Sequence, residues 1–424
     1  MPSDLGALSP ELLKRLISYI PQPSDLTALC LVSKQLRAIA TPALYHTVVL
    51  DLSARRAFDG FCSRQSLGHG YVRELTFLPL IIERDAYGKQ GRSAVQQVLL
   101  LLPRNVLTQL TLPETLHLDK VTVGIMCTRQ SNLRSIRLGS LGFAPAADNR
   151  TFRLLKNLTT LRITDAIYGE HDIDHYAKIL QESTRINTLE LCLSADYDDE
   201  ENVELVEDAF QDGLLECGIL STTLLAPFMQ KKLCLVKLQL KAVDLFRCRI
   251  DSPFAQAIKF ELLSRLHLYD CPRTGELLEY LAIVAEKTPL CLKGFICTSR
   301  VTVDVNFADA AATFLSCFSG LQYLMIDDAC GEYEAWIDMS VLETHYATLT
   351  DLYMGFGSNK GPPHGRHLAM SLDELQDLCS RAQNLKQLAL AWPSSWFSET
   401  RGDSLGIKPT LASPTTLATR GRLH

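Results

Sequence analysis

The chain has 424 residues, of which 47% are apolar and 21% are charged, a composition typical of globular proteins with a large core. Its net charge of −6 offers no dominant basic field for phosphate groups, which argues against a nucleic-acid-binding protein. No apolar run approaches the roughly 18–20 residues of a membrane span, and no signal-peptide pattern opens the chain, so we expect a cytoplasmic or nuclear protein that contacts no membrane. The thirteen cysteines form no C-x-x-C pair, and we expect them to be reduced thiols.

Residues 8–45 carry the pattern of three short helices. Ser9 can cap the first helix, Pro10 suits its first position, and the charge of Glu11 complements its dipole. Leucine and isoleucine then recur at helical spacing until Pro21 ends the helix.

The second helix is expected to open at Ser24 and Asp25, and the third near Ser33, before Pro42 breaks it. About half of residues 8–45 are apolar, and a unit this small cannot turn every leucine inward. The pattern therefore predicts an apolar surface left for a partner. Part of that surface could instead pack on the chain that follows.

One short pattern, apolar-x-x-apolar-x-apolar, recurs along the rest of the chain. Its last two apolar positions lie two residues apart, so a strand places both side chains on one face. The middle residues of the pattern are Leu75, Leu110, Ile136, Leu161, Leu189, Leu238, Leu266, Phe295, Leu324, Leu352 and Leu388.

The spacing of these middle residues indicates a repeated unit, because seven of the ten intervals are 25–29 residues long. The longest interval, 49 residues, contains the acidic run 196–201. We interpret that run as a solvated insertion, with a binding loop for a basic partner as the alternative.

Helical periodicity between the strands predicts helices over 172–183, 276–286 and 371–382. One strand plus one helix cannot bury its own apolar face, so neighbouring units must stack. The prediction is an α/β solenoid, with a curved parallel sheet inside and helices outside. An ordinary doubly wound sheet is the alternative.

Over residues 70–392 this pattern resembles leucine-rich repeats. That family places Asn or Cys three residues after the last strand leucine, and Cys271, three residues after Leu268, is the best match.

The N-terminal segment resembles the F-box, a helical module of about 40 residues. The matching residues are Leu8-Ser9-Pro10-Glu11-Leu12-Leu13, Ile17, Tyr19, Ile20, Asp25-Leu26, Leu29, Val32-Ser33-Lys34 and Arg37. The resemblance implies that the module binds the Skp-type adaptor of a cullin-RING ubiquitin ligase, and through it a cullin. It implies an adaptor interface formed by Leu8, Pro10, Glu11, Leu12, Ile17, Ile20, Leu26, Leu29 and Val32.

Strand residues that alternate with the buried leucines are expected on the concave face of the sheet, where a protein target would bind. Tyrosine and arginine are the residue types that anchor such interfaces. The candidates for target binding are Arg137, Arg162, Arg265, His267, Tyr269, Tyr323 and Tyr353.

Motifs of catalysis are missing from the sequence, which contains no P-loop, dinucleotide fingerprint or G-x-S-x-G elbow. His171 and His175 lie four apart and could form half of a metal site, but no further ligand accompanies them, and a solvated helix face explains them better. We therefore expect no catalytic residues, no metal and no cofactor.

The sequence divides into an F-box-like module at 1–46, a repeat region at 47–397 and a tail at 398–424 whose composition predicts disorder. The leading hypothesis is the substrate-recognition subunit of an SCF-type ubiquitin ligase. A non-catalytic repeat scaffold outside ubiquitin transfer is the alternative, and an enzyme with a site in the loops is a third.

Overall fold

The fold is described from a computed structural model. The structure describes residues 8–63, 68–78, 87–113, 116, 118–139, 151–164, 176, 179–180, 182–183, 185–192, 240, 242–246, 257–269, 271, 273–299, 307–328, 337, 339–356 and 372–390. The predicted acidic insertion at 196–201 and the predicted tail at 398–424 lie outside these residues.

The described residues form a mixed α/β structure around one parallel sheet, whose twelve strands lie in the order of the chain. Each strand pairs with the next one along the sequence, so the sheet grows in one direction only. The strands are β1 Thr47–Asp51, β2 Glu74–Leu78, β3 Gln109–Thr111, β4 Ser135–Leu138, β5 Thr160–Thr164, β6 Thr188–Cys192, β7 Ala242–Phe246, β8 Arg265–Tyr269, β9 Gly294–Ser299, β10 Tyr323–Asp328, β11 Asp351–Phe356 and β12 Gln387–Leu390.

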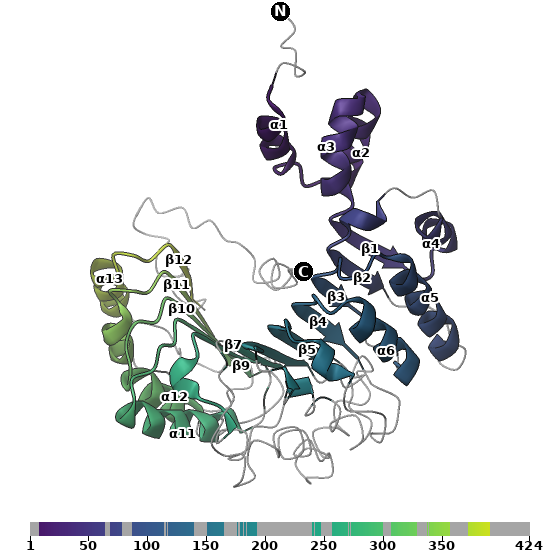
Figure 1. The fold of residues 1–424 in the computed structure, drawn as a ribbon. Helices are drawn as coiled ribbons and strands as arrows, with labels where there is room; N and C mark the ends of the chain where they lie inside the picture. The colour runs from purple at the N-terminus through teal and green to yellow at the C-terminus, as the bar shows by residue number, and fades with distance from the viewer. Residues whose placement is uncertain are drawn as a thin grey trace, which may run out of the picture.

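Helices precede the sheet and connect its strands. The sheet follows an arc, and helices α4 to α6 and α11 to α13 lie on its outer side (Figure 1). The described helices are α1 Pro10–Ile17, α2 Pro23–Val32, α3 Lys34–Leu44, α4 Arg55–Cys62, α5 Tyr87–Leu101, α6 Lys120–Arg129, α11 Thr274–Lys287, α12 Phe307–Ser316 and α13 Leu372–Arg381, with 3-10 turns η2 His69–Tyr71, η3 Phe152–Leu154, η5 Phe260–Leu262 and η6 Met339–His345.

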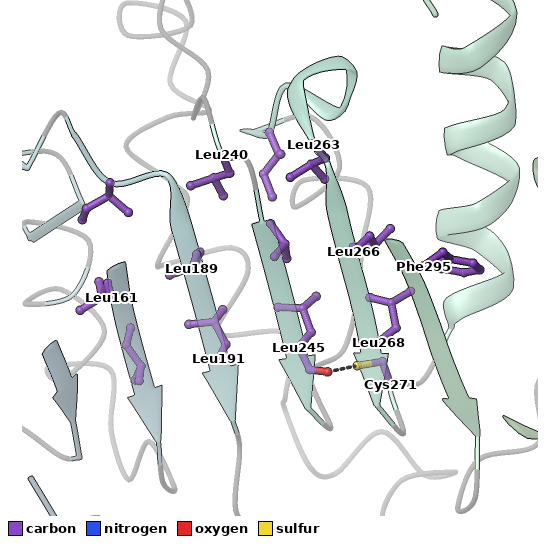
Figure 2. Close-up of a cluster of buried hydrophobic side chains, with 14 of the residues drawn as sticks. Leu161, Leu189, Leu191, Leu240, Leu245, Leu263, Leu266, Leu268, Cys271 and Phe295 are labelled. Atoms are coloured by element: carbon purple, nitrogen blue, oxygen red, sulfur yellow. Dashed lines mark hydrogen bonds between the residues drawn. The ribbon is translucent and has the colours of Figure 1, made fainter. Parts of the chain in front are cut away.

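The core is a stack of aliphatic layers between the sheet and the outer helices. The middle leucines of adjacent units are register partners, as Leu161 and Leu189 are on β5 and β6, and both are fully buried. Figure 2 shows these side chains and their neighbours on one side of the strands. Burying a leucine side chain contributes about 1.5–3 kcal/mol, so the repetition of this layer provides much of the stabilisation.

Two strands differ from the sequence prediction. β7 lies at Ala242–Phe246, so its buried triplet is Leu240-Val243-Leu245, and the prediction with Leu238 in the middle was wrong. Val243 pairs with Leu189 and with Leu266, and this register decides the assignment. β1 was not predicted from the triplet pattern, because the residue three positions before Val48 is Tyr45, whereas every predicted triplet begins with an aliphatic residue.

The helix predictions agree with the structure in two of the three connecting segments. α11 covers the predicted 276–286, and α13 covers most of 371–382. Of 172–183, the structure describes Tyr176, Ile179, Leu180 and Glu182, which are helical, and Ser183, which is not. The predicted break at Pro42 was wrong, because Pro42 lies inside α3, less than one turn before the helix ends at Leu44.

Backbone carbonyl groups join successive units at the edge where the strands begin. The carbonyl of Arg73 accepts the N–H groups of Thr108 and Gln109 at 2.8 and 3.0 Å, and the carbonyl of Arg134 accepts those of Thr159 and Thr160 at 2.8 and 2.9 Å. Thr108 and Thr159 add a hydroxyl hydrogen bond to the same carbonyls. The same set of hydrogen bonds to one carbonyl group, which we call a polar rung, therefore joins each of these units to the previous one.

Two buried polar side chains serve a similar purpose. Gln130 accepts the N–H groups of Val106 and Leu107, both at 3.1 Å, through Oε1. His345 accepts the N–H of Leu321 at 3.3 Å through Nδ1. In each case a following unit satisfies a backbone donor of the previous one, as buried polar groups require.

Candidate interaction surfaces

The N-terminal helices begin where the sequence supplies caps. Ser9 Oγ accepts the N–H of Leu12 at 3.4 Å at the start of α1, and Ser33 Oγ accepts the N–H of Leu36 at 3.1 Å at the start of α3. Both hydrogen bonds satisfy backbone donors that a helix N-terminus leaves without a partner. These caps fix the ends of helices that are too short to be stable alone.

The three helices α1 to α3 form a module, residues 8–46, with its own small core. Ile17, Leu26 and Ala40 form the buried cluster of the module. Ile20, Leu29, Cys30, Ile39, Ala43 and Leu44 pack against this cluster and are partly buried.

Several large apolar side chains of the module face solvent. On α1 and the turn after it, Leu12, Leu16 and Tyr19 are 52%, 50% and 71% exposed. At the end of α2, Leu31 and Val32 are 76% and 69% exposed. We call these five residues the module patch. Five large apolar side chains exposed on so small a module mark a candidate partner surface.

The nine predicted adaptor residues fall into three groups. Pro10, Glu11, Leu12 and Val32 are exposed, and Leu8, Ile20 and Leu29 are partly buried. Ile17 and Leu26, at 4% and 6% exposure, belong to the module's own core. The predicted contact role of these two residues is therefore corrected, because their side chains are occupied in holding the helices together.

Leu16, Tyr19 and Leu31 belong to the module patch but were missing from the predicted set. Leu16 follows Leu12 by four residues, so helical spacing alone places both on one face. Exposed charges in the described module are mostly basic, namely Lys14, Arg15, Lys34 and Arg37 against Glu11 and Asp25. An apolar partner surface with acidic groups around it would fit this module.

The module is attached directly to the sheet. The His46 carbonyl accepts the N–H groups of Arg73 and Glu74 at 2.9 and 3.0 Å, the same rung that joins later units. Thr47 Oγ1 donates to Glu74 Oε2 at 2.9 Å. The ring of Tyr45 lies so close to Gly68 that a Cβ there would come within 2.1 Å of it. The connection between α3 and the first two strands is therefore tightly packed.

The concave face of the sheet is a lattice of side chains in register, opposite the leucine core. Arg137 pairs with Arg162, and Arg162 pairs with Glu190 on the next strand. Arg162 Nε lies 2.7 Å from Glu190 Oε2, so Glu190 offsets the charge of Arg162. The structure thus brings the predicted residues Arg137 and Arg162 together on β4 and β5.

The other predicted target residues lie on β8, β10 and β11. Arg265, His267 and Tyr269 share one face of β8, and the rings of His267 and Tyr269 meet edge to face at 6.0 Å. On β10, Tyr323 is register partner of Asp351, and burial together with the Asp351 charge raises the pKa of Tyr323.

Tyr353, on β11, is the register partner of Met325, two residues after Tyr323 on β10. A Cβ on Gly355 would come within 3.0 Å of Tyr353 Oη and 2.7 Å of Asp327 Oδ1, so glycine makes room for this ring. The seven predicted residues therefore form two sets on the concave face, one on β4 and β5 and the other on β8 to β11. No signal in the sequence revealed this division.

Within the described part of the chain, no group of three or more His, Cys, Asp or Glu side chains could hold a metal ion. The predicted half-site at His171 and His175 lies outside the described residues. Burial raises the pKa of the Cys127 thiol to about 12, which keeps it protonated and unreactive at neutral pH.

Among the described helices, none has the length and apolar character required to cross a bilayer.

No protein-family model and no curated protein sequence matches this chain.

Proposed function

We propose that this protein is the substrate-recognition subunit of an SCF-type ubiquitin ligase. In this proposal the helical module is an F-box that binds a Skp-type adaptor, and the sheet with its outer helices is a leucine-rich-repeat solenoid that holds a protein target. The protein itself carries out no chemistry, since ubiquitin transfer belongs to other subunits.

The module patch carries the proposal. Three helices bury only a small cluster among themselves, yet they leave Leu12, Leu16, Tyr19, Leu31 and Val32 in solvent. Apolar residues in such an arrangement are the usual anchors of a helical partner surface. The F-box resemblance of residues 8–37 supplies the identity of the partner.

The junction at His46 and Tyr45 supports the same function. A receptor must hold its target at a set distance from the adaptor, and the shared rung between His46 and the Arg73-Glu74 backbone fixes the module against β1 and β2. The concave face, with tyrosine and arginine side chains in register, is a broad surface suited to a protein target.

The test is recovery of adaptor and cullin by the full chain from a cell extract. Leu12→Ala combined with Leu31→Ala should lower recovery of both at least tenfold, because truncating central apolar anchors typically costs about 2 kcal/mol or more in binding. Leu100→Ala combined with Val121→Ala is the matched control, since these residues are also more than half exposed, on α5 and α6.

Two outcomes would count against the proposal. Wild-type protein that recovers no adaptor would contradict F-box function altogether. Wild-type protein that recovers adaptor but no cullin would favour the alternative, a repeat scaffold outside ubiquitin transfer.

A further inference from the structure

The edge of the sheet where β3 to β6 begin carries one exposed cation on each unit. Arg104 precedes β3, Arg134 precedes β4, Lys156 precedes β5 and Arg185 precedes β6, and all four side chains are exposed. We call these four residues the basic edge. A row of this kind is unexpected on a chain whose net charge is −6.

None of the four forms an ion pair with the described part of the chain. Arg185 Nη1 donates to the neutral Asn157 Oδ1 at 3.1 Å. The nearby Glu182 is engaged by Arg153, with Nε and Oε2 2.9 Å apart. The described acids of this region therefore do not neutralise the basic edge.

The turns that carry these cations are held rigidly. Ser131 Oγ donates to Asn105 Oδ1 at 2.9 Å, and Asn132 Nδ2 donates to the Asn105 carbonyl at 3.1 Å. The carbonyl of Thr108 accepts the N–H of Arg134 at 2.7 Å. These hydrogen bonds fix the turns of Arg104 and Arg134, and the four cations lie in the turns before four consecutive strands, which are about 4.8 Å apart.

This spacing decides which anion fits. The starts of four consecutive strands extend over about 14 Å, so the basic edge is a row of cations, whereas a single phosphate would require its cations to converge on one point. An extended peptide covers the same span in about five residues at roughly 3.3 Å each. We propose that the basic edge binds an extended stretch of a protein partner that is rich in aspartate and glutamate.

Nucleic acid fits the basic edge less well. Binding of single strands relies on aromatic side chains on which bases stack, and the described turns before β3 to β6 contain no exposed aromatic residue. That the acidic stretch belongs to a ubiquitylation target rests on the proposed function. That the basic edge binds such a stretch does not depend on the proposed function.

The test uses the full chain and a fluorescein-labelled twelve-residue Glu-Ser repeat peptide, with fluorescence anisotropy as the readout. Arg104→Glu, Arg134→Glu and Arg185→Glu combined should weaken binding at least tenfold relative to wild type. Arg56→Glu, Lys120→Glu and Lys287→Glu combined is the matched control, because it changes the net charge equally at exposed residues of helices and should leave affinity within about twofold.

Three further probes complete the test: a Gln-Ser repeat peptide, the same neutral peptide with one phosphoserine, and a twelve-nucleotide uridine RNA. All should bind wild type at least tenfold more weakly than the Glu-Ser peptide. An equal loss in the two triple variants, or a Glu-Ser peptide that binds no better than any of the three probes, would overturn the proposal.

Circular dichroism verifies that the edge variant is folded, and the three corresponding Arg→Gln substitutions give the same comparison if the charge reversal unfolds the chain. Adaptor recovery is measured on the same variants. Adaptor recovery tests only the proposed function, and peptide binding tests only the basic edge, because peptide binding is measured without adaptor.

Discussion

His345 joins two units of the sheet through a single fully buried ring. Its Nδ1 accepts the Leu321 N–H, so its Nε2 carries the proton and donates to the Leu315 carbonyl at 3.0 Å. Burial lowers the pKa of His345 from its ordinary value of 6.5, although the hydrogen bond to Leu315 acts in the opposite direction. The neutral imidazole is therefore the form that fits.

This protonation state predicts a pH dependence of stability. The unfolded chain binds a proton at His345 near pH 6.5 and the folded chain only at lower pH, so stability rises with pH across that window. The contribution is complete above pH 6.5 and is lost as pH falls below it. Urea unfolding at pH 7.5 and 5.5 should show a smaller pH effect for His345→Gln than for wild type. An identical pH effect in both proteins would contradict the account.

His345→Ala removes both hydrogen bonds at any pH. Leaving the Leu321 N–H and the Leu315 carbonyl buried without a partner should cost about 1–3 kcal/mol of unfolding free energy for each group. The same urea measurement at pH 7.5 provides this value. A loss under about 0.5 kcal/mol would show that the ring is not a bridge between the units.

Gly68 is a second single residue that bears on a larger part of the structure, in this case the junction between the module and the sheet. Gly68→Ala places a Cβ within 2.1 Å of the Tyr45 ring, so the ring or the junction must move. We expect a loss of about 1–3 kcal/mol, the usual cost of overpacking. Gly70→Ala is the control, since no atom lies within 4 Å of its Cβ position. Thermal unfolding of both variants measures the difference, and equal midpoints would contradict a tight junction.

The strand-and-helix units were predictable because their signal is local. Two apolar residues two positions apart define a strand face, and the regular spacing of Leu266, Phe295 and Leu324 is unambiguous. β7 was misplaced because Leu235-Leu238-Leu240 and Leu240-Val243-Leu245 both satisfy the pattern and share Leu240. Only the pairing of β7 with β6 and β8 distinguishes them, and pairing is not a local property.

The polar rungs were missed for a related reason. Thr108 and Thr159 precede strands, where threonine is common. Each contributes by donating its hydroxyl to a carbonyl group 25 to 35 residues earlier in the chain. Cys271 is the exception, because its position after Leu268 stood out in the sequence. The structure buries it with Sγ 3.6 Å from the Leu245 carbonyl on the neighbouring strand (Figure 2).

Stacked units should differ in stability according to their place in the stack. Leu266 on β8 is covered by layers on both sides, whereas Leu388 on the last strand is 36% exposed. Leu266→Ala should cost about 2–5 kcal/mol and Leu388→Ala under about 2 kcal/mol. Urea unfolding of the two variants makes the comparison. Equal costs would show that β12 is not the end of the apolar stack.

Across the whole molecule, the sequence predicted which face of a strand is buried better than which helical residues are buried. Leu12 and Val32 were predicted for the module surface and are exposed, but Ile17 and Leu26 are internal, because a small module must use some of its conspicuous leucines for its own core. The concave residues follow from strand alternation alone. The basic edge could not be predicted, since Arg104, Arg134 and Arg185 become neighbours only when the units stack.

The proposal depends above all on one binding reaction, between the full chain and a purified Skp-type adaptor, and titration calorimetry measures it directly. We expect a 1:1 complex with a dissociation constant of about 1 μM or tighter, weakened at least tenfold by Leu12→Ala with Leu31→Ala. No binding at adaptor concentrations of about 100 μM, or an affinity unchanged by that double substitution, would contradict it.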